Sequence, residues 1–394
     1  RLESFMTPHA QRNVSSSALL AAALALCLPR PSARADSSIA YKFENYREED
    51  GRITVETQSA EVNQDFGSLT HLTLTDTIDA ISGATPTGQP APAGSDLVPE
   101  TNIHERRKAW NGDLSVQVKN VNLDFGFADS RESDYVSQGW SINSLVDLNQ
   151  KNTTLRLGVA GTSDQVEIFF LPGKWEAKHS GDAILGVTQL LDPLTFVTVN
   201  VTIGEAKGYL AEPHKFVEKE IEVFPGVFLD EAFGENSPGK RNKETVFASI
   251  NRAFPAAKGA VEASYRFYSD SFGITANTVE LSWIQHVGSH LDLQPMVRLY
   301  EQSAANFYYY DLDTTPIIPV HVPTIGSGPF YTSDLRLSSM DTYAFGLTAT
   351  CKVSDRVRLD LAYQQYNMYG RDGVTPASAY PRAGVTTAGI RFSW

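Results

Sequence analysis

About sixteen segments of roughly ten residues, each alternating between apolar and polar side chains, follow one another along most of the chain. The clearest covers residues 342–353, where the apolar residues Tyr343, Phe345, Leu347, Ala349, Cys351 and Val353 occupy every second position. Successive side chains of a β-strand point to opposite faces, so each segment predicts a strand with one apolar and one polar face. Because no helical period accompanies this alternation, the chain is expected to be all-β.

The links between the expected strands differ in length in a regular way. With the strands numbered from Ile39, the even-to-odd links are short: 63–67, 119–122, 149–152, 191–194, 255–259, 287–290 and 354–355. Every long link is of the other kind: 82–105, 162–178, 207–240, 304–337 and 370–382. Outer-membrane barrels have short periplasmic turns and long extracellular loops, whereas a soluble sandwich has no reason to sort its loops. The pattern predicts that residues 36–394 form a single transmembrane antiparallel up-and-down β-barrel of about sixteen strands.

Hydropathy and charge exclude several further classes of protein. Beyond residue 35 no run of about 18 apolar residues occurs, which excludes a helical membrane protein but not a barrel. The formal net charge is -13, and it becomes -16 without residues 1–35, which carry four arginines and one glutamate. This acidic balance argues against nucleic acid as a partner. Cys351 is then the single cysteine, so no intrachain disulfide or cysteine cluster is expected.

Residues 1–35 are expected to be a secretory signal peptide. Arg1 and Arg12 form a basic head, residues 18–28 an apolar run, and Ala33-Arg34-Ala35 a small-residue cleavage site. We expect cleavage after Ala35 and export by the general secretory route. Met6 is a candidate for the true start. Lipidation is the less favoured alternative, because Leu26 precedes Cys27 where a small residue is required.

The last strand is expected to close the barrel. Ala388, Ile390, Phe392 and Trp394 share one face of segment 388–394. Outer-membrane barrels usually end on such a strand, with an aromatic residue at the membrane interface. We therefore expect Ile390, Phe392 and Trp394 to form the signal for the barrel-insertion machinery, which, with outer-membrane lipid, is the expected partner. A homo-oligomer is compatible with this pattern, and an edge strand of a soluble β protein is the alternative.

Charged residues gather on the faces opposite the apolar stripes. Those expected to line a pore are Arg156, Glu262, Arg266, Asp270, Glu280, Arg298, Arg358, Asp360 and Arg391. The interior of a barrel of about sixteen strands is wide enough for an aqueous channel, and opposed charges in it can set selectivity. The sequence predicts a porin-like passage for small solutes or ions. Alternatively, these charges only neutralise one another and keep the interior hydrated.

Segment 207–240 is too apolar for a freely solvated loop. Its apolar residues include Phe216, Val217, Ile221, Val223, Phe224, Val227, Phe228 and Leu229. We expect it to pack against the mouth or to fold into the lumen. A plugged barrel would instead be a non-conducting scaffold for a periplasmic or surface partner, such as a redox protein. The aromatic run 307–310 is expected to form an interfacial girdle.

No cofactor, metal site or enzymatic activity is predicted. His286 and His290 are four residues apart, but on a strand entering a turn this spacing does not bring two imidazoles together. No G-x-S-x-G motif occurs, so a barrel-wall hydrolase that depends on His71, His286 or His290 is the least favoured alternative. Carboxylates in 310–313 and 371–373 suit a surface calcium ion, although such residues more often form turns.

Several stretches resemble one bacterial family. They are DAISGATPTG (79–88), NQKNTTL (149–155), SYRFYSDSFGI (264–274), QSAANFYY (302–309), and GRDGVT (370–375) before SAYP (378–381). Together they resemble exported proteins known only as the domain of unknown function number three thousand five hundred and seventy. The resemblance implies a Gram-negative outer-membrane location, no established activity and no catalytic residues. Arg266 and Asp270 lie within the shared stretches, whereas 207–240 departs from the family pattern.

Overall fold

The computed structural model describes residues 37–92, 95–168 and 171–394. The expected signal peptide and its cleavage site at Ala35 lie outside the described residues. Within the described part of the chain, no helix has the length and hydropathy of a transmembrane span.

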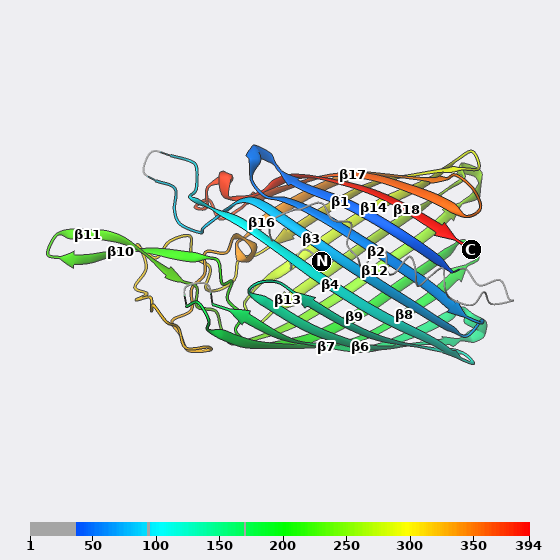
Figure 1. Ribbon diagram of the computed structural model, residues 1–394, viewed down its shortest axis with the longest axis horizontal. Helices are drawn as coiled ribbons and strands as arrows, with labels where there is room; N and C mark the ends of the chain where they lie inside the picture. The colour runs from blue at the N-terminus through cyan, green and yellow to red at the C-terminus, as the bar shows by residue number, and fades with distance from the viewer. Residues whose placement is uncertain (1–36, 93–94, 169–170) are drawn as a thin grey trace.

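Sixteen strands close into one antiparallel barrel (Figure 1), as the alternation predicts. They are β1 (Ser38–Glu48), β2 (Thr54–Phe66), β3 (Thr70–Pro86), β4 (Glu100–Val118), β5 (Val121–Arg131), β6 (Tyr135–Leu148), β7 (Thr153–Glu167), β8 (Trp175–Asp192), β9 (Thr195–Gly208), β12 (Lys240–Phe254), β13 (Gly259–Asp270), β14 (Thr275–Val287), β15 (Leu291–Gln302), β16 (Met340–Lys352), β17 (Val357–Gly370) and β18 (Arg382–Ser393). Each pairs with its neighbours along the chain, and β9 pairs with β12. The seam is between β1 and β18, where Ser38 lies opposite Ser393.

Two further strands, β10 (Phe216–Phe224) and β11 (Val227–Gly234), form a separate hairpin between β9 and β12. Figure 1 shows this hairpin projecting from one end of the barrel. Five short 3-10 turns complete the described structure: η1 (Glu49–Gly51), η2 (Asn149–Lys151), η3 (Pro255–Ala257), η4 (Leu335–Leu337) and η5 (Ala377–Ala379).

The two ends of the barrel differ as expected. One end, which also holds the C-terminus, carries only the short links 67–69, 119–120, 149–152, 193–194, 255–258, 288–290 and 353–356 (Figure 1). The other, here called the mouth, carries the long links, including 87–99, 209–239, 303–339 and 371–381. Strands β3 and β4 extend further toward the mouth than the alternation indicates. Above Trp110, the outward positions of β4 are Lys108 and Arg106, so the apolar period stops before the strand does.

The outward face of the wall is apolar. Phe345 is 55% exposed, and it lies directly opposite Val297 of β15, so the apolar stripe continues from strand to strand. The neighbouring outward residues Tyr343 and Leu347 are exposed in the same way. Thr348, at the next position, takes the opposite face. An apolar exterior of this kind is stable only in contact with lipid, as in a transmembrane barrel.

Buried packing is concentrated at the mouth. One cluster joins Phe272, Ile274, Ala305 and Phe307, and a second joins Val217, Phe233, Leu312 and Tyr331. The expectation that residues 307–310 form an interfacial girdle is therefore wrong at Phe307. This ring is only 6% exposed and packs edge-on against Phe272 beneath the loops.

Candidate functional site: the mouth lid and the inner wall

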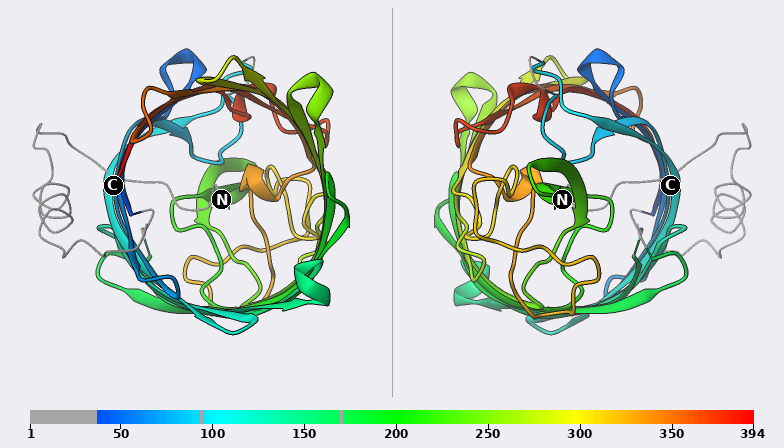
Figure 2. Two further views of the ribbon diagram at one scale, coloured as in Figure 1. Left: turned by 90° about the vertical axis from the view of Figure 1, so that its right-hand side faces the viewer. Right: turned by 90° about the vertical axis from the view of Figure 1, so that its left-hand side faces the viewer.

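Long loops cross the mouth of the barrel. Figure 2, viewed along the barrel axis, shows the segments between β9 and β12 and between β15 and β16 spanning the opening, and Figure 1 places them at that end. Among the described residues, none of these loops runs down the inside of the barrel to the short-turn end. Segment 207–240 was expected either to pack against the mouth or to fold into the lumen, and it packs against the mouth. We call the segments 209–215, 235–239 and 303–339 the lid.

A buried network of charges ties the lid together. Glu235 lies just after β11, and its carboxylate accepts hydrogen bonds from the backbone N–H of Ser333 at 3.1 Å and of Asp334 at 3.0 Å. The Thr332 hydroxyl donates to the same oxygen at 2.6 Å. Arg336 binds Asp334 and also the carboxylate of Glu212. These contacts join two loops that are distant in sequence. The hydrogen bonds of Arg336 to Asp334 and Glu212 are charge-assisted, and such bonds are about twice as strong as neutral ones.

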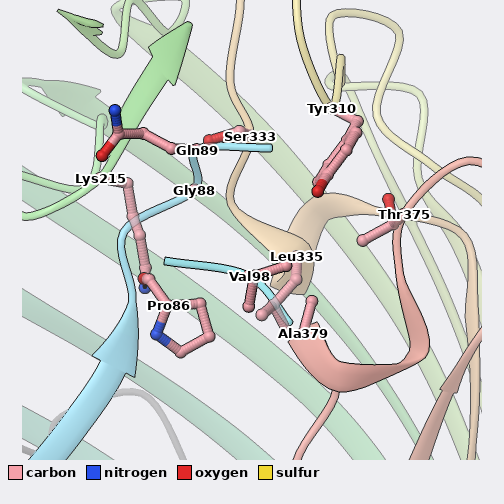
Figure 3. Close-up of a pocket in the computed structure, with 10 residues that line it drawn as sticks. All are labelled: Pro86, Gly88, Gln89, Val98, Lys215, Tyr310, Ser333, Leu335, Thr375 and Ala379. Atoms are coloured by element: carbon pink, nitrogen blue, oxygen red, sulfur yellow. Dashed lines mark hydrogen bonds between the residues drawn. The ribbon is translucent and has the colours of Figure 1, made fainter. Parts of the chain in front are cut away.

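Four loops meet beside this network (Figure 3). The Lys215 ammonium donates to the carbonyl of Pro86, and the Ser333 hydroxyl donates to the carbonyl of Phe216 at 2.6 Å. Burial lowers the pKa of Lys215. The space enclosed here, also lined by Tyr310, Thr375 and Ala379, is about 10 Å³, close to the minimum for one water molecule. This joint therefore holds the loops together and has no room for an organic ligand.

An acidic cluster lies where the lid meets the wall. Single carboxylate oxygens of Glu105, Glu132 and Asp134 lie within 4.8 Å of one another. His214 of the lid has its Nε2 2.7 Å from Asp134. Burial, reinforced by the charge of Asp134, raises the pKa of Glu132 to about 7. The oxygens could hold a calcium ion, but a partly protonated Glu132 reduces the charge available to it. The contact between His214 and Asp134 thus joins the lid to the acidic cluster.

The inner wall is polar. The predicted pore-lining residues lie on the strand faces opposite the apolar stripe. Glu280 lies directly opposite Arg298, and Arg358 directly opposite Arg391. Arg391 also lies 3.4 Å from Glu61. The remaining members on these faces are Arg156, Glu262, Arg266 and Asp360. That these residues line a conducting path stays a prediction.

Asp270 has a different environment from the other predicted pore residues. Its side chain is fully covered, and it accepts hydrogen bonds from Arg241 at 2.8 Å and from the Tyr268 hydroxyl at 2.7 Å. It also accepts from the backbone N–H of Phe272 and Ile274, at 2.9 and 3.1 Å. The carboxylate therefore closes the turn between β13 and β14 and presents no oxygen to a passage.

A shallow hollow of about 220 Å³ lies along the wall between β4 and β8. Its lining includes the inward-facing residues Asn111, Asp113, Ser141, Thr162, Ser180 and Asp182. Next to it, the inward face of Gly204 is covered by the Asp182 carboxylate, and that of Gly186 by the Asn200 amide. Because these glycines lack side chains, the Asp182 carboxylate and the Asn200 amide lie directly over the backbone of the neighbouring strand.

The histidines of the hydrolase alternative lie at the short-turn end. His71 contacts Asp65 at 2.5 Å, and His286 contacts Asp292 at 2.5 Å. His290 contacts its neighbour Ser289 at 2.6 Å. The barrel does not bring His71 close to the other two, because β3 and β14 are separated by many strands in the sheet order. Asp372, one of the loop carboxylates, accepts hydrogen bonds from the backbone of Val374 and Thr375, as a turn former does.

The C-terminal residues have the expected placement. Ile390 and Phe392 are exposed on the outward face, and Phe392 lies opposite Ile39 at the seam. The backbone N–H of Trp394 donates to the Ser37 carbonyl at 3.0 Å, and the Trp394 ring stacks on that of Phe392 with the ring centroids 6.2 Å apart. Recognition by the insertion machinery stays a prediction.

The residues of the lid network had not been singled out in the sequence. Glu212, Lys215, Glu235, Asp334 and Arg336 lie in loops without periodicity, and their contacts join distant parts of the chain. The only sequence signal was the apolar character of segment 207–240.

The fold is similar to those of several solved bacterial proteins. A siderophore receptor, PirA from Pseudomonas aeruginosa, is 11% identical with a TM-score of 0.43, and the match covers 92% of this chain. This chain spans 62% of the length of that receptor. OmpT of Vibrio cholerae is 9% identical with a TM-score of 0.45, over 93% of this chain and 99% of that one. A bacterial polysaccharide outer-membrane secretin is 6% identical with a TM-score of 0.49, over 91% and 98%.

Comparison with curated proteins found no match. A family model described as a protein of unknown function (DUF3570) matches residues 12–171 and 171–379, which is most of the chain. The protein therefore belongs to the DUF3570 family.

Proposed function

We propose that this protein lies in the bacterial outer membrane and provides a gated passage for small polar solutes or ions. The observation that carries this proposal is the polar inner wall. Apolar side chains face outward, whereas Glu280, Arg298 and their neighbours face inward, and the long loops lie at the mouth (Figure 1). An interior lined by charges favours water and ions over apolar compounds.

The lid supplies the gate. Arg336 joins Asp334 to Glu212, and both carboxylates belong to loops that span the opening. The Arg336–Glu212 contact is polar, and the Arg336 side chain is half exposed, so this contact can break without exposing apolar side chains. Opening then consists of separating 209–215 from 332–336 while the barrel stays closed.

Planar-bilayer recording tests the passage and its gate. The variant R336Q removes the cation of the latch and is expected to raise the open probability or the conductance. R356Q is the matched control, because Arg356 is exposed in a turn at the opposite end. If the wild-type protein and R336Q conduct no current in any salt, the proposal is wrong.

The alternative, a non-conducting scaffold, has one observation in its favour: the hairpin β10–β11 extends away from the mouth (Figure 1). Deleting residues 216–234 separates the two functions. A gated passage should conduct more readily after the deletion, whereas a scaffold should lose its partner and gain no conductance.

A further inference from the structure

The hairpin β10–β11 is anchored at its base as an arm that projects from the mouth (Figure 1). Val217 and Phe233 lie opposite each other in the register and are buried against Leu312 and Tyr331. The Lys219 ammonium donates to the carbonyl of Leu312 at 2.7 Å. The base is therefore held by apolar packing and by a charged hydrogen bond, and the tip extends beyond both.

The tip of this arm is apolar and open to water. Phe224 is 71% exposed, Phe228 51% and Leu229 59%. Val223 and Val227 are exposed beside them, and the turn is completed by Gly226, whose φ of +73° suits glycine. Single exposed apolar residues are common, but a contiguous group at the end of a projecting element marks an interaction site.

One face of the same hairpin is acidic. Glu220 lies directly opposite Asp230, and Glu222 lies opposite Phe228. Like charges directly opposite each other destabilise a strand pair. In the described part of the chain, none of the ion pairs involves Glu220, Glu222 or Asp230. Lys219, the basic residue of β10, points to the other face. The repulsion is thus left for a basic partner to relieve.

The acidic face also selects among occupants of the apolar tip. A second copy of this chain would bring an identical acidic face, and the whole chain carries a net charge of -13. An anionic lipid surface would be repelled in the same way. A protein with lysine or arginine around an apolar pocket would bury the tip and neutralise the face together.

We propose that the arm β10–β11 is a docking site for a protein partner that presents an apolar pocket flanked by lysine or arginine. Phe224, Phe228 and Leu229 enter the pocket, and Glu220, Glu222 and Asp230 pair with the basic rim. This interaction goes beyond the passage proposed above and does not depend on conductance.

Fluorescence anisotropy tests the proposal with the full-length protein in nanodiscs of uncharged lipid, with empty nanodiscs as the baseline. The probe is a short labelled peptide of alternating lysine and phenylalanine. Two control peptides carry glutamate for lysine or serine for phenylalanine. We expect the probe to bind at least about tenfold more tightly than either control, and its affinity to fall as salt rises.

Variants locate the binding. F224S/F228S should weaken probe binding at least about tenfold, and E220Q/D230N should weaken it and reduce its salt dependence. L97S/V374S, which alters exposed apolar residues of two other mouth loops, should bind like the wild type. Comparing the gel mobility of heated and unheated samples checks that each variant still forms the barrel. Unchanged binding by F224S/F228S, equal binding of the glutamate peptide, or a hairpin-dependent dimer in sedimentation would overturn the proposal.

Discussion

Arg336 and Glu212 lie 124 residues apart in the chain, yet the guanidinium of Arg336 donates a hydrogen bond to the carboxylate of Glu212. The same guanidinium binds Asp334 at 2.6 Å, and the neighbouring backbone N–H groups of Ser333 and Asp334 bind Glu235. The two halves of the lid therefore share one cation between carboxylates. Removing that cation leaves the carboxylates of Asp334 and Glu212 facing each other without a positive charge between them.

R336Q should make the lid easier to open. Leaving charged hydrogen-bonding groups without their partner costs about 1–3 kcal/mol, and the barrel is not involved. Limited proteolysis should therefore cut the segments 209–239 and 303–339 several-fold faster in R336Q, with no change in the melting of the barrel. R356Q should be cut at the wild-type rate. Equal cleavage of R336Q and wild type would show that this contact does not hold the lid.

The lid should loosen as the pH rises. Burial and the charge of Asp334 raise the pKa of Glu235 to about 8, and burial with the charge of Asp134 raises that of Glu132 to about 7. A carboxyl with a raised pKa binds its proton more tightly when folded, so its stabilising contribution is present at low pH and is lost between about pH 4.5 and its folded pKa.

His214 acts in the same direction. Burial alone would lower its pKa, but the hydrogen bond to Asp134 and the nearby charge of Glu212 raise it. The contact of charged His214 with Asp134 stabilises the lid fully at a pH below the unfolded-state pKa of His214. This stabilisation is lost as the pH rises through the folded-state pKa. Lys215, Arg107 and Arg336 are the cations near these groups.

Open probability in bilayers should increase from about pH 5.5 to 8, and E132Q should reduce this dependence. An unchanged or opposite pH profile would contradict the assignment.

Much of the barrel could be predicted because lipid imposes a simple rule on its outer face. Phe345 and Val297 had to point outward, and the alternation around them shows this without any knowledge of partners. Residues 100–105 of β4, which were expected to belong to the link 82–105, escaped prediction because the outward positions Asn102 and His104 are polar. The contacts of the lid could not be predicted from the sequence, for a different reason. Glu235 and Asp334 meet through irregular loops, and no local pattern records a contact between residues so distant in sequence.

Asp270 should matter for stability and not for permeation. D270A removes an acceptor from Arg241, Tyr268 and two turn amides, and it leaves the guanidinium of Arg241 without its carboxylate over the ring of Phe272. Breaking such a buried pair costs about 3–5 kcal/mol. Gel-shift melting should show the loss, whereas D355N, at an exposed turn carboxylate, should melt like the wild type. A stable D270A with altered ion selectivity would instead place Asp270 in the passage.

The inward charges should set the ion preference of the passage. Glu280 and Arg298 lie directly opposite each other on β14 and β15, so changing either alters the local balance without touching the lid. R298Q should shift the reversal potential in a salt gradient toward cations, and E280Q should shift it toward anions. Because the paired charges partly cancel, the double variant should lie close to the wild type. R356Q, outside the lumen, should leave the reversal potential unchanged. If R298Q and E280Q shift it in the same direction, or not at all, these residues keep the wall hydrated and do not select ions.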